Sequence, residues 1–266
     1  MTARRLSTLM VEKVWGREVL PAPFAAPPGT RIGEIWFEPP PELPQVLVKY
    51  LFTSEKLSVQ VHPSEATALP GEAGKEECWL VLDAEEGAEL AIGFAREVTR
   101  EEIAAAARDG SIETLLAWYP AQAGDLFYLP AGTVHAIGPG LALVEVQQTS
   151  DTTFRLYDYG RPRELHLERA LAVASGGVYA PGNKGSVTAG PVLVDGPHFR
   201  LDRIEGAPDA ATSAAWSGAL LALPLAGEIA AKDGSARAAA GECLVADGLD
   251  SLDFGGAQVT LLARAA

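Results

Sequence analysis

The stretch Leu57-Ser58-Val59-Gln60-Val61-His62 indicates the fold of this chain more directly than any other part of the sequence. Apolar and polar residues alternate along it, and this pattern predicts a β-strand because successive side chains of a strand point to opposite faces. Ser58, Gln60 and His62 would then share one face. An amide and an imidazole directed the same way from one strand offer two donor atoms to a metal ion.

A second stretch, Pro130-Ala131-Gly132-Thr133-Val134-His135, would bring another imidazole to the same place. Its glycine permits a tight turn with close backbone approach, and its proline fixes the backbone path into that turn. A carboxylate would come from Gly74-Lys75-Glu76-Glu77-Cys78-Trp79. Only one of Glu76 and Glu77 can point to the same centre, because neighbouring strand residues face opposite ways. We therefore predict a β-barrel with a metal site inside it.

Composition limits the class of protein. A chain of 266 residues can form one large or two small domains, and 48% hydrophobic residues indicate a globular protein. The net charge of -14 argues against binding to nucleic acid or membrane surfaces, which requires basic patches. A phosphorylated substrate would need a local cluster of Lys and Arg, because the overall field repels it.

Cysteine usage and the N-terminal sequence favour a cytoplasmic protein. Only Cys78 and Cys243 occur, which excludes a disulfide scaffold and is typical of a reducing compartment. Residues 1–13 contain no apolar stretch long enough for a signal peptide. No segment approaches the roughly 20 apolar residues of a membrane span.

Most of the chain has the pattern of short strands separated by Pro-rich or polar turns. Thr99 followed by two glutamates is a favourable helix start, so residues 99–107 and 111–118 are expected to form a small helical insertion, and 166–174 another short helix. Strands of the first half are expected at residues 31–38, 45–52, 57–61, 77–82, 89–93, 125–129, 141–147 and 153–159.

The sequence predicts two domains of unequal size. Residues 1–175 would form the catalytic, metal-binding domain, with its helical insertion near 99–118. The Gly- and Pro-rich segment 176–185 would be a linker. Residues 186–266 would form a smaller β-domain without a metal site, with strands near 192–195, 199–205, 219–224, 242–246 and 258–263.

The spacing of Gly124, Pro130, Gly132 and His135 resembles the second motif of the cupin superfamily, a family of jelly-roll barrels. The first cupin motif has two histidines followed by a glutamate on paired strands. In this chain a glutamine, Gln60, takes the place of the first histidine, and an insertion separates the two parts of the motif. That departure resembles the type I mannose-6-phosphate isomerases.

The resemblance runs from about residue 10 to about residue 175. It implies a mainly β fold, a cupin-type jelly-roll barrel with a small helical insertion, followed by a second, smaller jelly-roll half. It also selects Glu77 over Glu76 as the carboxylate. The stretches that carry it are Val14-Trp15-Gly16, residues 57–63, residues 74–79, residues 130–136 and residues 150–159.

The expected metal ligands are Gln60, His62, Glu77 and His135. A lone buried histidine is more often a hydrogen-bonded core residue, but both histidines here fall within motif spacing. Two imidazoles, a carboxylate and an amide oxygen suit Zn²⁺ with an open position for substrate. The same set would accept Mn²⁺, Fe²⁺ or Co²⁺, so the assignment of zinc depends on the resemblance.

Glu145 and Arg155 lie equally far from Ser150, in the middle of a polar turn. If the flanking strands form a hairpin, the two residues face each other across it. They could form a structural ion pair. The resemblance instead implies that both lie in the active site, where the planar, charged guanidinium suits a phosphate or a developing oxyanion. Lys75 is either a solvated loop charge or a residue at the mouth of the pocket.

The resemblance implies interconversion of D-mannose 6-phosphate and D-fructose 6-phosphate. Such an isomerase moves a proton between C1 and C2 of an open-chain sugar, and a Lewis-acid metal can stabilise the enediolate. A positioned base carries the proton. Glu145 and Lys75 are rival candidates for that base, and Arg155 could stabilise negative oxygen.

Two other functions fit a cupin metal site. One is an oxygenase that uses Fe²⁺, although Gln60 counts against it because that class is expected to have two clustered histidines. The other is a sugar-phosphate-binding cupin without catalysis. The sequence gives no prediction of oligomeric state.

Overall fold

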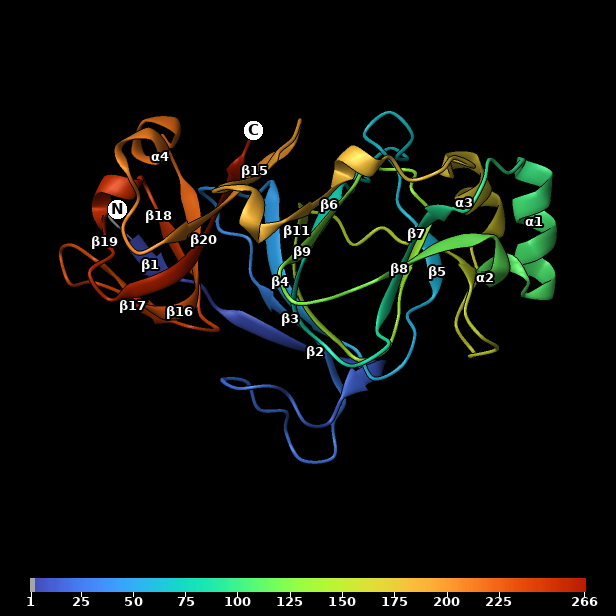
Figure 1. The fold of residues 1–266 in the computed structure, drawn as a ribbon, viewed down its shortest axis with the longest axis horizontal. Coiled ribbons are helices and arrows are strands. Elements are labelled where there is room, and N and C mark those ends of the chain that lie inside the picture. The colour runs from blue at the N-terminus through green and yellow to red at the C-terminus, as the bar shows by residue number, and fades with distance from the viewer. Residues whose placement is uncertain (1–2) are drawn as a thin grey trace.

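The computed structural model describes residues 3–266, and within them the strands form three antiparallel sheets (Figure 1). The mainly β fold expected from the sequence is confirmed. The seven-stranded sheet contains β2 (Thr8–Arg17), β3 (Ile32–Phe37), β4 (Val46–Phe52), β6 (Glu77–Ala84), β9 (Asp125–Leu129), β11 (Leu141–Gln148) and β13 (Lys184–Ser186). The five-stranded sheet contains β5 (Val59–Val61), β7 (Glu89–Phe94), β8 (Leu116–Pro120), β10 (His135–Ile137) and β12 (Phe154–Tyr157).

The third sheet is eight-stranded and belongs almost wholly to the C-terminal half. Its strands are β1 (Ala3–Arg5), β14 (Val192–Asp195), β15 (Phe199–Glu205), β16 (Leu220–Ala231), β17 (Arg237–Ala239), β18 (Leu244–Ala246), β19 (Leu252–Asp253) and β20 (Ala257–Ala265). The helices are α1 (Arg100–Asp109), α2 (Ile112–Leu115), α3 (Leu167–Val173) and α4 (Ala210–Ala215), with 3-10 turns η1 (Pro181–Asn183), η2 (Val187–Ala189) and η3 (Leu249–Ser251). None of the helices within residues 3–266 is long and apolar enough to cross a membrane.

The five-stranded and seven-stranded sheets form a jelly-roll barrel. Their strand orders are β12-β5-β10-β7-β8 and β13-β9-β6-β11-β4-β3-β2. A shared apolar core joins them, with Trp79 and Phe127 from the larger sheet and Leu90 and Ile92 from the smaller one. Helices α1, α2 and α3 cover the outer face of the smaller sheet (Figure 1). Polar side chains that point between the two sheets are therefore shielded from water.

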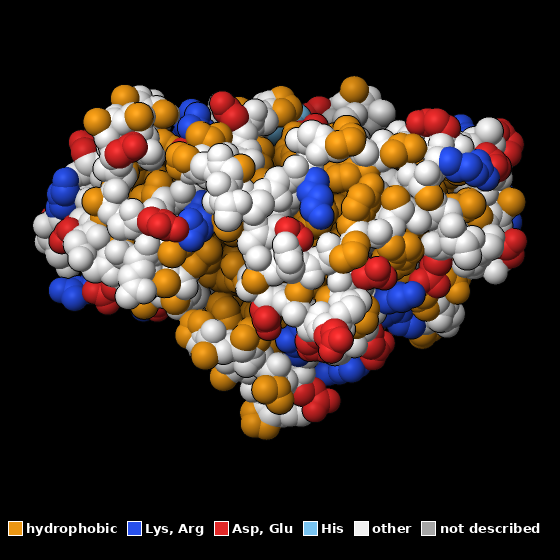
Figure 2. All heavy atoms as spheres, viewed as in Figure 1, with side chains coloured by type: hydrophobic (Ala, Val, Ile, Leu, Met, Phe, Trp, Pro, Cys, Tyr) orange, Lys and Arg blue, Asp and Glu red, His pale blue; other side chains and the backbone are white. Residues whose placement is uncertain are grey.

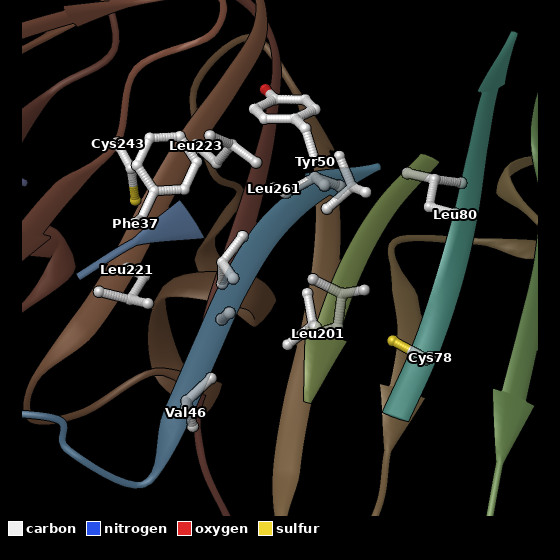
Figure 3. Close-up of a cluster of buried hydrophobic side chains, with 14 of the residues drawn as sticks. Phe37, Val46, Tyr50, Cys78, Leu80, Leu201, Leu221, Leu223, Cys243 and Leu261 are labelled. Atoms are coloured by element: carbon white, nitrogen blue, oxygen red, sulfur yellow. The ribbon is translucent and has the colours of Figure 1, made fainter. Parts of the chain in front are cut away.

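The two halves of the chain share one hydrophobic core, because the outer face of the seven-stranded sheet packs against the eight-stranded sheet. Phe37, Tyr50 and Cys78 approach from the first, and Leu221 and Leu261 from the second (Figure 3). Cys78 faces this core, away from the barrel interior, as strand alternation predicted. Both cysteines are free and buried.

Pairings cross the predicted linker in both directions. Strand β1 pairs with β18 of the C-terminal half, and β13, which overlaps the predicted linker, pairs with β9 of the barrel. The two halves are therefore connected by strand pairing, and their division at residues 176–185 remains a proposal. The segment before β3 projects as a loop at the bottom of the view, where apolar side chains gather (Figures 1 and 2).

The helical insertion agrees with the sequence in its first part only. Thr99 caps α1 through a reciprocal capping box with Glu102, as expected. The second helix was predicted over residues 111–118, and this prediction is wrong beyond Leu115. Residues from Leu116 form β8, because their backbone pairs with β7 at the sheet edge, and that tertiary pairing overrides local helical preference.

Candidate metal centre

The five-stranded sheet positions the imidazoles and the amide. In its pairing register Gln60 lies opposite His135 on one side and Arg155 on the other, and His62 directly follows β5. The turn before β10 uses a glycine at φ 84°, and the Gly132 N–H donates to the carbonyl of His62 at 2.9 Å. This hydrogen bond ties the two histidine-bearing segments together.

The opposite sheet contributes the carboxylate. Glu77 is the first residue of β6, and its side chain is buried between the sheets. The ligand atoms of His62, Glu77 and His135 all lie within 4.8 Å of one another. Glu76 points away and contacts Tyr128 and His198. Strand alternation therefore correctly predicted that only one of the two adjacent glutamates reaches this centre.

Backbone carbonyls set the tautomer of both imidazoles. Nδ1 of His62 lies 2.8 Å from the oxygen of Thr152, and Nδ1 of His135 lies 2.9 Å from the oxygen of Thr133. A carbonyl oxygen can only accept, so each Nδ1 carries the hydrogen and each Nε2 keeps its lone pair. Those Nε2 atoms lie 3.5 and 3.4 Å from the two oxygens of Glu77. Metal-binding histidines are oriented in this way.

The protonation states of the three residues suit a divalent cation. Burial lowers the pKa of both His62 and His135, so both imidazoles are neutral. Burial alone would raise the pKa of Glu77, but the charge and hydrogen bond of Lys75 outweigh it and hold that pKa below its usual range. Two neutral imidazoles and one carboxylate form a site that could hold a metal ion.

Lys75 provides a second observation that the centre favours positive charge. Its Nζ lies 2.6 Å from Oε2 of Glu77 and 3.0 Å from Nε2 of His62. The ammonium thus lies against the atoms that would bind a metal. Lys75 is only 5% exposed, so it is not a solvated loop charge, and it lies deeper than the pocket mouth that was the alternative expectation.

The side chain of Gln60 reaches the same centre, but its amide nitrogen faces that centre and its oxygen faces away. Its Oε1 accepts from Oγ of Ser58 at 3.1 Å, while its Nε2 lies 3.3 Å from Nε2 of His135. The oxygen and nitrogen of an amide are nearly equal in size, and a half-turn would direct the oxygen to the centre. A ligand role for Gln60 remains a proposal that requires this half-turn.

The predicted hairpin between Glu145 and Arg155 is wrong. Strand β11 pairs with β4 and β6, whereas β12 pairs with β5 in the other sheet. After Gln148 the chain does not turn back but crosses the barrel. Both residues nevertheless line one cavity of about 320 Å³, together with Gln60, Lys75 and Glu77.

Glu145 belongs instead to a row of side chains that crosses four neighbouring strands. Trp36, Lys49, Glu145 and Trp79 are successive register partners on β3, β4, β11 and β6. Nζ of Lys49 lies 2.9 Å from Oε1 of Glu145, and the indole of Trp79 donates to Oε2 at 3.1 Å. One oxygen of Glu145 is therefore held by a hydrogen bond and the other by an ion pair.

Two charged residues of this region were missed in the sequence. Lys49 and Glu34 are 5% and 6% exposed and line the same cavity. Each is the one charged residue in an otherwise apolar strand, VLVKYLF for β4 and IGEIWF for β3. A charge inside a buried strand must be paired, and this signal could have identified both.

Arg155 lies at the other end of the cavity. It is half-buried, and among the described residues no side chain forms an ion pair with its guanidinium, whose buried Nε has no hydrogen-bond partner. Burial and the nearby Arg163 lower the pKa of Arg155, while Arg163 itself is paired with Asp158. An unpaired guanidinium that lines a cavity is suited to an anion.

The fold and site define the class as a cupin-type jelly roll with a candidate metal centre. Two solved structures share this fold across nearly the whole chain. The mannose 6-phosphate isomerase from Bacillus subtilis has a TM-score of 0.78 at 24% identity, covering 99% of this chain and 100% of that one. A putative mannosephosphate isomerase from Archaeoglobus fulgidus has a TM-score of 0.75 at 18% identity, covering 99% and 97%.

Sequence relatives confirm the resemblance that the motifs indicated. The chain is 48% identical over 139 residues to the mannose-6-phosphate isomerase of Streptococcus mutans. It is 44% identical over 137 residues to the mannose-6-phosphate isomerase ManA of Bacillus subtilis. Each match covers 48% of this chain and 43% of the relative, so the matched region is less than half of those proteins. No family model matches the chain.

Proposed function

We propose that this protein is a metal-dependent aldose–ketose isomerase that interconverts D-mannose 6-phosphate and D-fructose 6-phosphate. The observation that carries the proposal is the cluster of His62, Glu77 and His135, because its Glu77 lines a cavity that Glu145 and Arg155 also line. The substrate is inferred from the relatives, which are named mannose-6-phosphate isomerases. A cavity of about 320 Å³ is within the range of small-molecule sites.

We propose zinc as the metal, with His62, Glu77 and His135 as ligands and Gln60 as a fourth after its amide turns. The fixed Nε2 lone pairs and the ionised carboxylate fit such an ion, and Lys75 would withdraw its ammonium as the ion enters. When bound, the metal would supply Lewis-acid polarisation of the sugar oxygens. All further steps depend on the side chains of this chain.

Glu145 is the base that we favour for proton transfer. Burial and the charge of Glu77 raise its pKa, which Lys49 and Lys75 only partly offset, and a raised pKa makes a carboxylate a stronger base. It would take the proton from C2, so that the C–H electrons form a C1–C2 double bond and O1 gains negative charge. It would then return the proton to C1 while the hydroxyl proton moves from O2 to O1.

Lys75 is the alternative base, because its Nζ lies 3.8 Å from Oε1 of Glu145 and faces the same cavity. Arg155 would bind either the phosphate or the negative sugar oxygen, since its guanidinium has five donors and remains charged. Arg163 lines the cavity beside it, with its charge offset by its pairing with Asp158. The charge of Arg155 would meet the requirement that an acidic chain needs a local cation to hold a phosphate.

The Fe²⁺ oxygenase and the non-catalytic binding protein are not favoured. The relatives carry the name of an isomerase, and an oxygenase would not require a buried base beside the ligands. The cytoplasmic location and the absence of nucleic-acid binding remain predictions from composition.

A coupled assay for fructose 6-phosphate formed from mannose 6-phosphate tests the proposal. Turnover is expected from the purified protein, loss of it after chelation, and recovery on adding zinc. Recovery with manganese, iron or cobalt in place of zinc would reassign the metal. Turnover that survives complete metal removal would contradict the mechanism, and absence of turnover in the zinc-loaded protein would overturn the proposed function.

A further inference from the structure

The row of paired charges on the seven-stranded sheet continues past Lys49, away from the metal ligands. Nζ of Lys49 lies 2.9 Å from Oε1 of Glu145 and 3.6 Å from Oε1 of Glu34. The other oxygen of Glu34 lies 3.1 Å from Nζ of Lys13 and accepts the indole N–H of Trp36 at 3.0 Å. Lys49 is therefore held between two carboxylates, and the outer carboxylate is itself held on two sides.

Burying a carboxylate in this way is unfavourable unless its charge is paired and hydrogen-bonded. Burial alone would raise the pKa of Glu34, but Lys49 and Lys13 lower it to about 2, so it is ionised at neutral pH. The strand that carries it, β3, is otherwise apolar. Glu34 contacts none of the candidate metal ligands, and its ion pair with Lys49 connects it to Glu145.

We propose that Glu34 is a positioning residue, which holds the ammonium of Lys49 between two carboxylates and thereby fixes the orientation and basicity of Glu145. The inference rests on the proposed function and on Glu145 as the base. Glu34 and Glu145 compete for one ammonium, so Lys49 binds each less tightly than it would bind either alone. Glu145 consequently keeps more of its basicity than a carboxylate in an undivided ion pair.

The sign of the effect follows from this competition. If Glu34 loses its charge, Lys49 moves fully to Glu145, and the repulsion between the two carboxylates also disappears. Both changes make Glu145 a weaker base. Besides Lys49, the charged groups that act on Glu145 are Lys75 and Glu77, and Arg155 from the opposite sheet lines the same cavity. None of these is altered.

Two substitutions with opposite expected signs test the proposal. Glu34→Gln keeps the acceptor for Trp36 but removes the charge. We expect about a tenfold fall in kcat with KM nearly unchanged, and an acid limb of the kcat–pH profile that moves to lower pH. Lys13→Gln leaves Glu34 free to attract Lys49 more strongly, so the acid limb should move to higher pH. Metal content should stay at the wild-type value in both variants.

Asp202 provides the matched control. It is a buried carboxylate that accepts the indole N–H of Trp216 at 2.7 Å and pairs with Arg200, but it lies in the eight-stranded sheet, outside the cavity. Asp202→Asn should lower stability without moving the pH profile. A purely structural role of Glu34 would make Glu34→Gln behave like this control.

The outcomes separate this inference from the proposed function. Limbs displaced in opposite directions support the positioning role. An unmoved limb in Glu34→Gln, or limbs displaced the same way in both variants, overturns it while wild-type turnover preserves the proposed function. If Glu34→Gln does not fold, Lys13→Gln decides alone, because Lys13 is partly exposed and an unmoved or lowered limb contradicts the role. A zinc-loaded wild type without turnover overturns the proposed function and this inference with it.

Discussion

Lys49 and Glu145 face each other across β4 and β11, with Nζ of the lysine 2.9 Å from Oε1 of the glutamate and both side chains buried. Trp36 and Trp79 continue the same row on the outer strands. The proposed base, Glu145, and the three side chains in its row thus lie on four adjacent strands of one sheet. Such a base does not depend on loop closure for its position, and groups on strands are held more precisely than groups on loops.

Replacing Glu145 with glutamine tests its role as the base. The amide keeps an acceptor for the indole of Trp79 but cannot take a proton, so kcat is expected to fall by about 10² to 10⁴-fold. Bound metal should be unchanged, because Glu145 is not a candidate ligand. Steady-state kinetics of the coupled reaction with metal analysis would measure both. A variant with near wild-type kcat would instead favour Lys75 as the base.

Removing the charge of Lys75 should strengthen metal binding. Its ammonium lies within 3.0 Å of atoms from both His62 and Glu77 and competes with the ion for them. Lys75→Met leaves the buried Glu77 without that partner, and an unpaired buried charge costs several kcal/mol. Zinc affinity, measured by competition with a chromogenic chelator, should rise by at least about tenfold. Equal or weaker affinity would show that Lys75 does not occupy the position where the metal binds.

Metal should also stabilise the fold. Ligand that binds only the folded state at 100 times its Kd adds about 2.7 kcal/mol, which for a chain of this size corresponds to a rise in Tm of roughly 5–10 °C. Differential scanning fluorimetry with and without zinc would detect it. His135→Ala should abolish the rise, whereas His198→Ala, which alters a histidine outside the cluster, should retain it. The same rise in both variants would place the metal elsewhere.

The ionisation of Glu34 predicts a pH-dependent stability. Its folded-state pKa, about 2, lies below the ordinary value of 4.5. A lowered carboxyl pKa stabilises the fold above the unfolded pKa, and this contribution is lost as the pH falls through the folded pKa. The shift corresponds to about 3 kcal/mol. Urea unfolding should show that Glu34→Gln is less stable than wild type at pH 7.

That difference should shrink as the pH falls from about 4.5 towards 2. Other carboxylates titrate alike in both proteins, so their effects cancel in the comparison. A wild-type advantage that is equal at pH 7 and pH 3 would mean that Glu34 contributes through packing or through the Trp36 hydrogen bond, not through its charge.

Local sequence pattern was sufficient for the parts of the site that depend on one strand or one turn. Alternation along residues 57–62 predicted that Gln60 and His62 share a face, and both side chains lie at the candidate metal centre. The same rule separated Glu77, which faces the centre, from Glu76 and Cys78, which do not. The glycine turn before His135 was equally clear, because a residue with a Cβ at position 132 would approach the carbonyl of Val173 to 2.9 Å.

The sequence pattern could not predict which strands, far apart in the chain, would pair with each other. Equal spacing of Glu145 and Arg155 about Ser150 cannot distinguish a chain that turns back from one that crosses to the other sheet. The role of Lys49 becomes apparent only when β4 lies beside β11, because its partner Glu145 is 96 positions away in the chain. Residues 116–118 likewise become a strand only because β7 offers an edge.

Anomalous X-ray scattering at the zinc absorption edge, from crystals of the zinc-loaded protein, tests the central claim most directly. The account predicts one strong peak per chain inside the barrel, about 2.0–2.2 Å from Nε2 of His62, Nε2 of His135 and a carboxylate oxygen of Glu77. The ammonium of Lys75 should be displaced from its present contacts. A peak that lacks these three ligands, or no peak between the two barrel sheets, would contradict it.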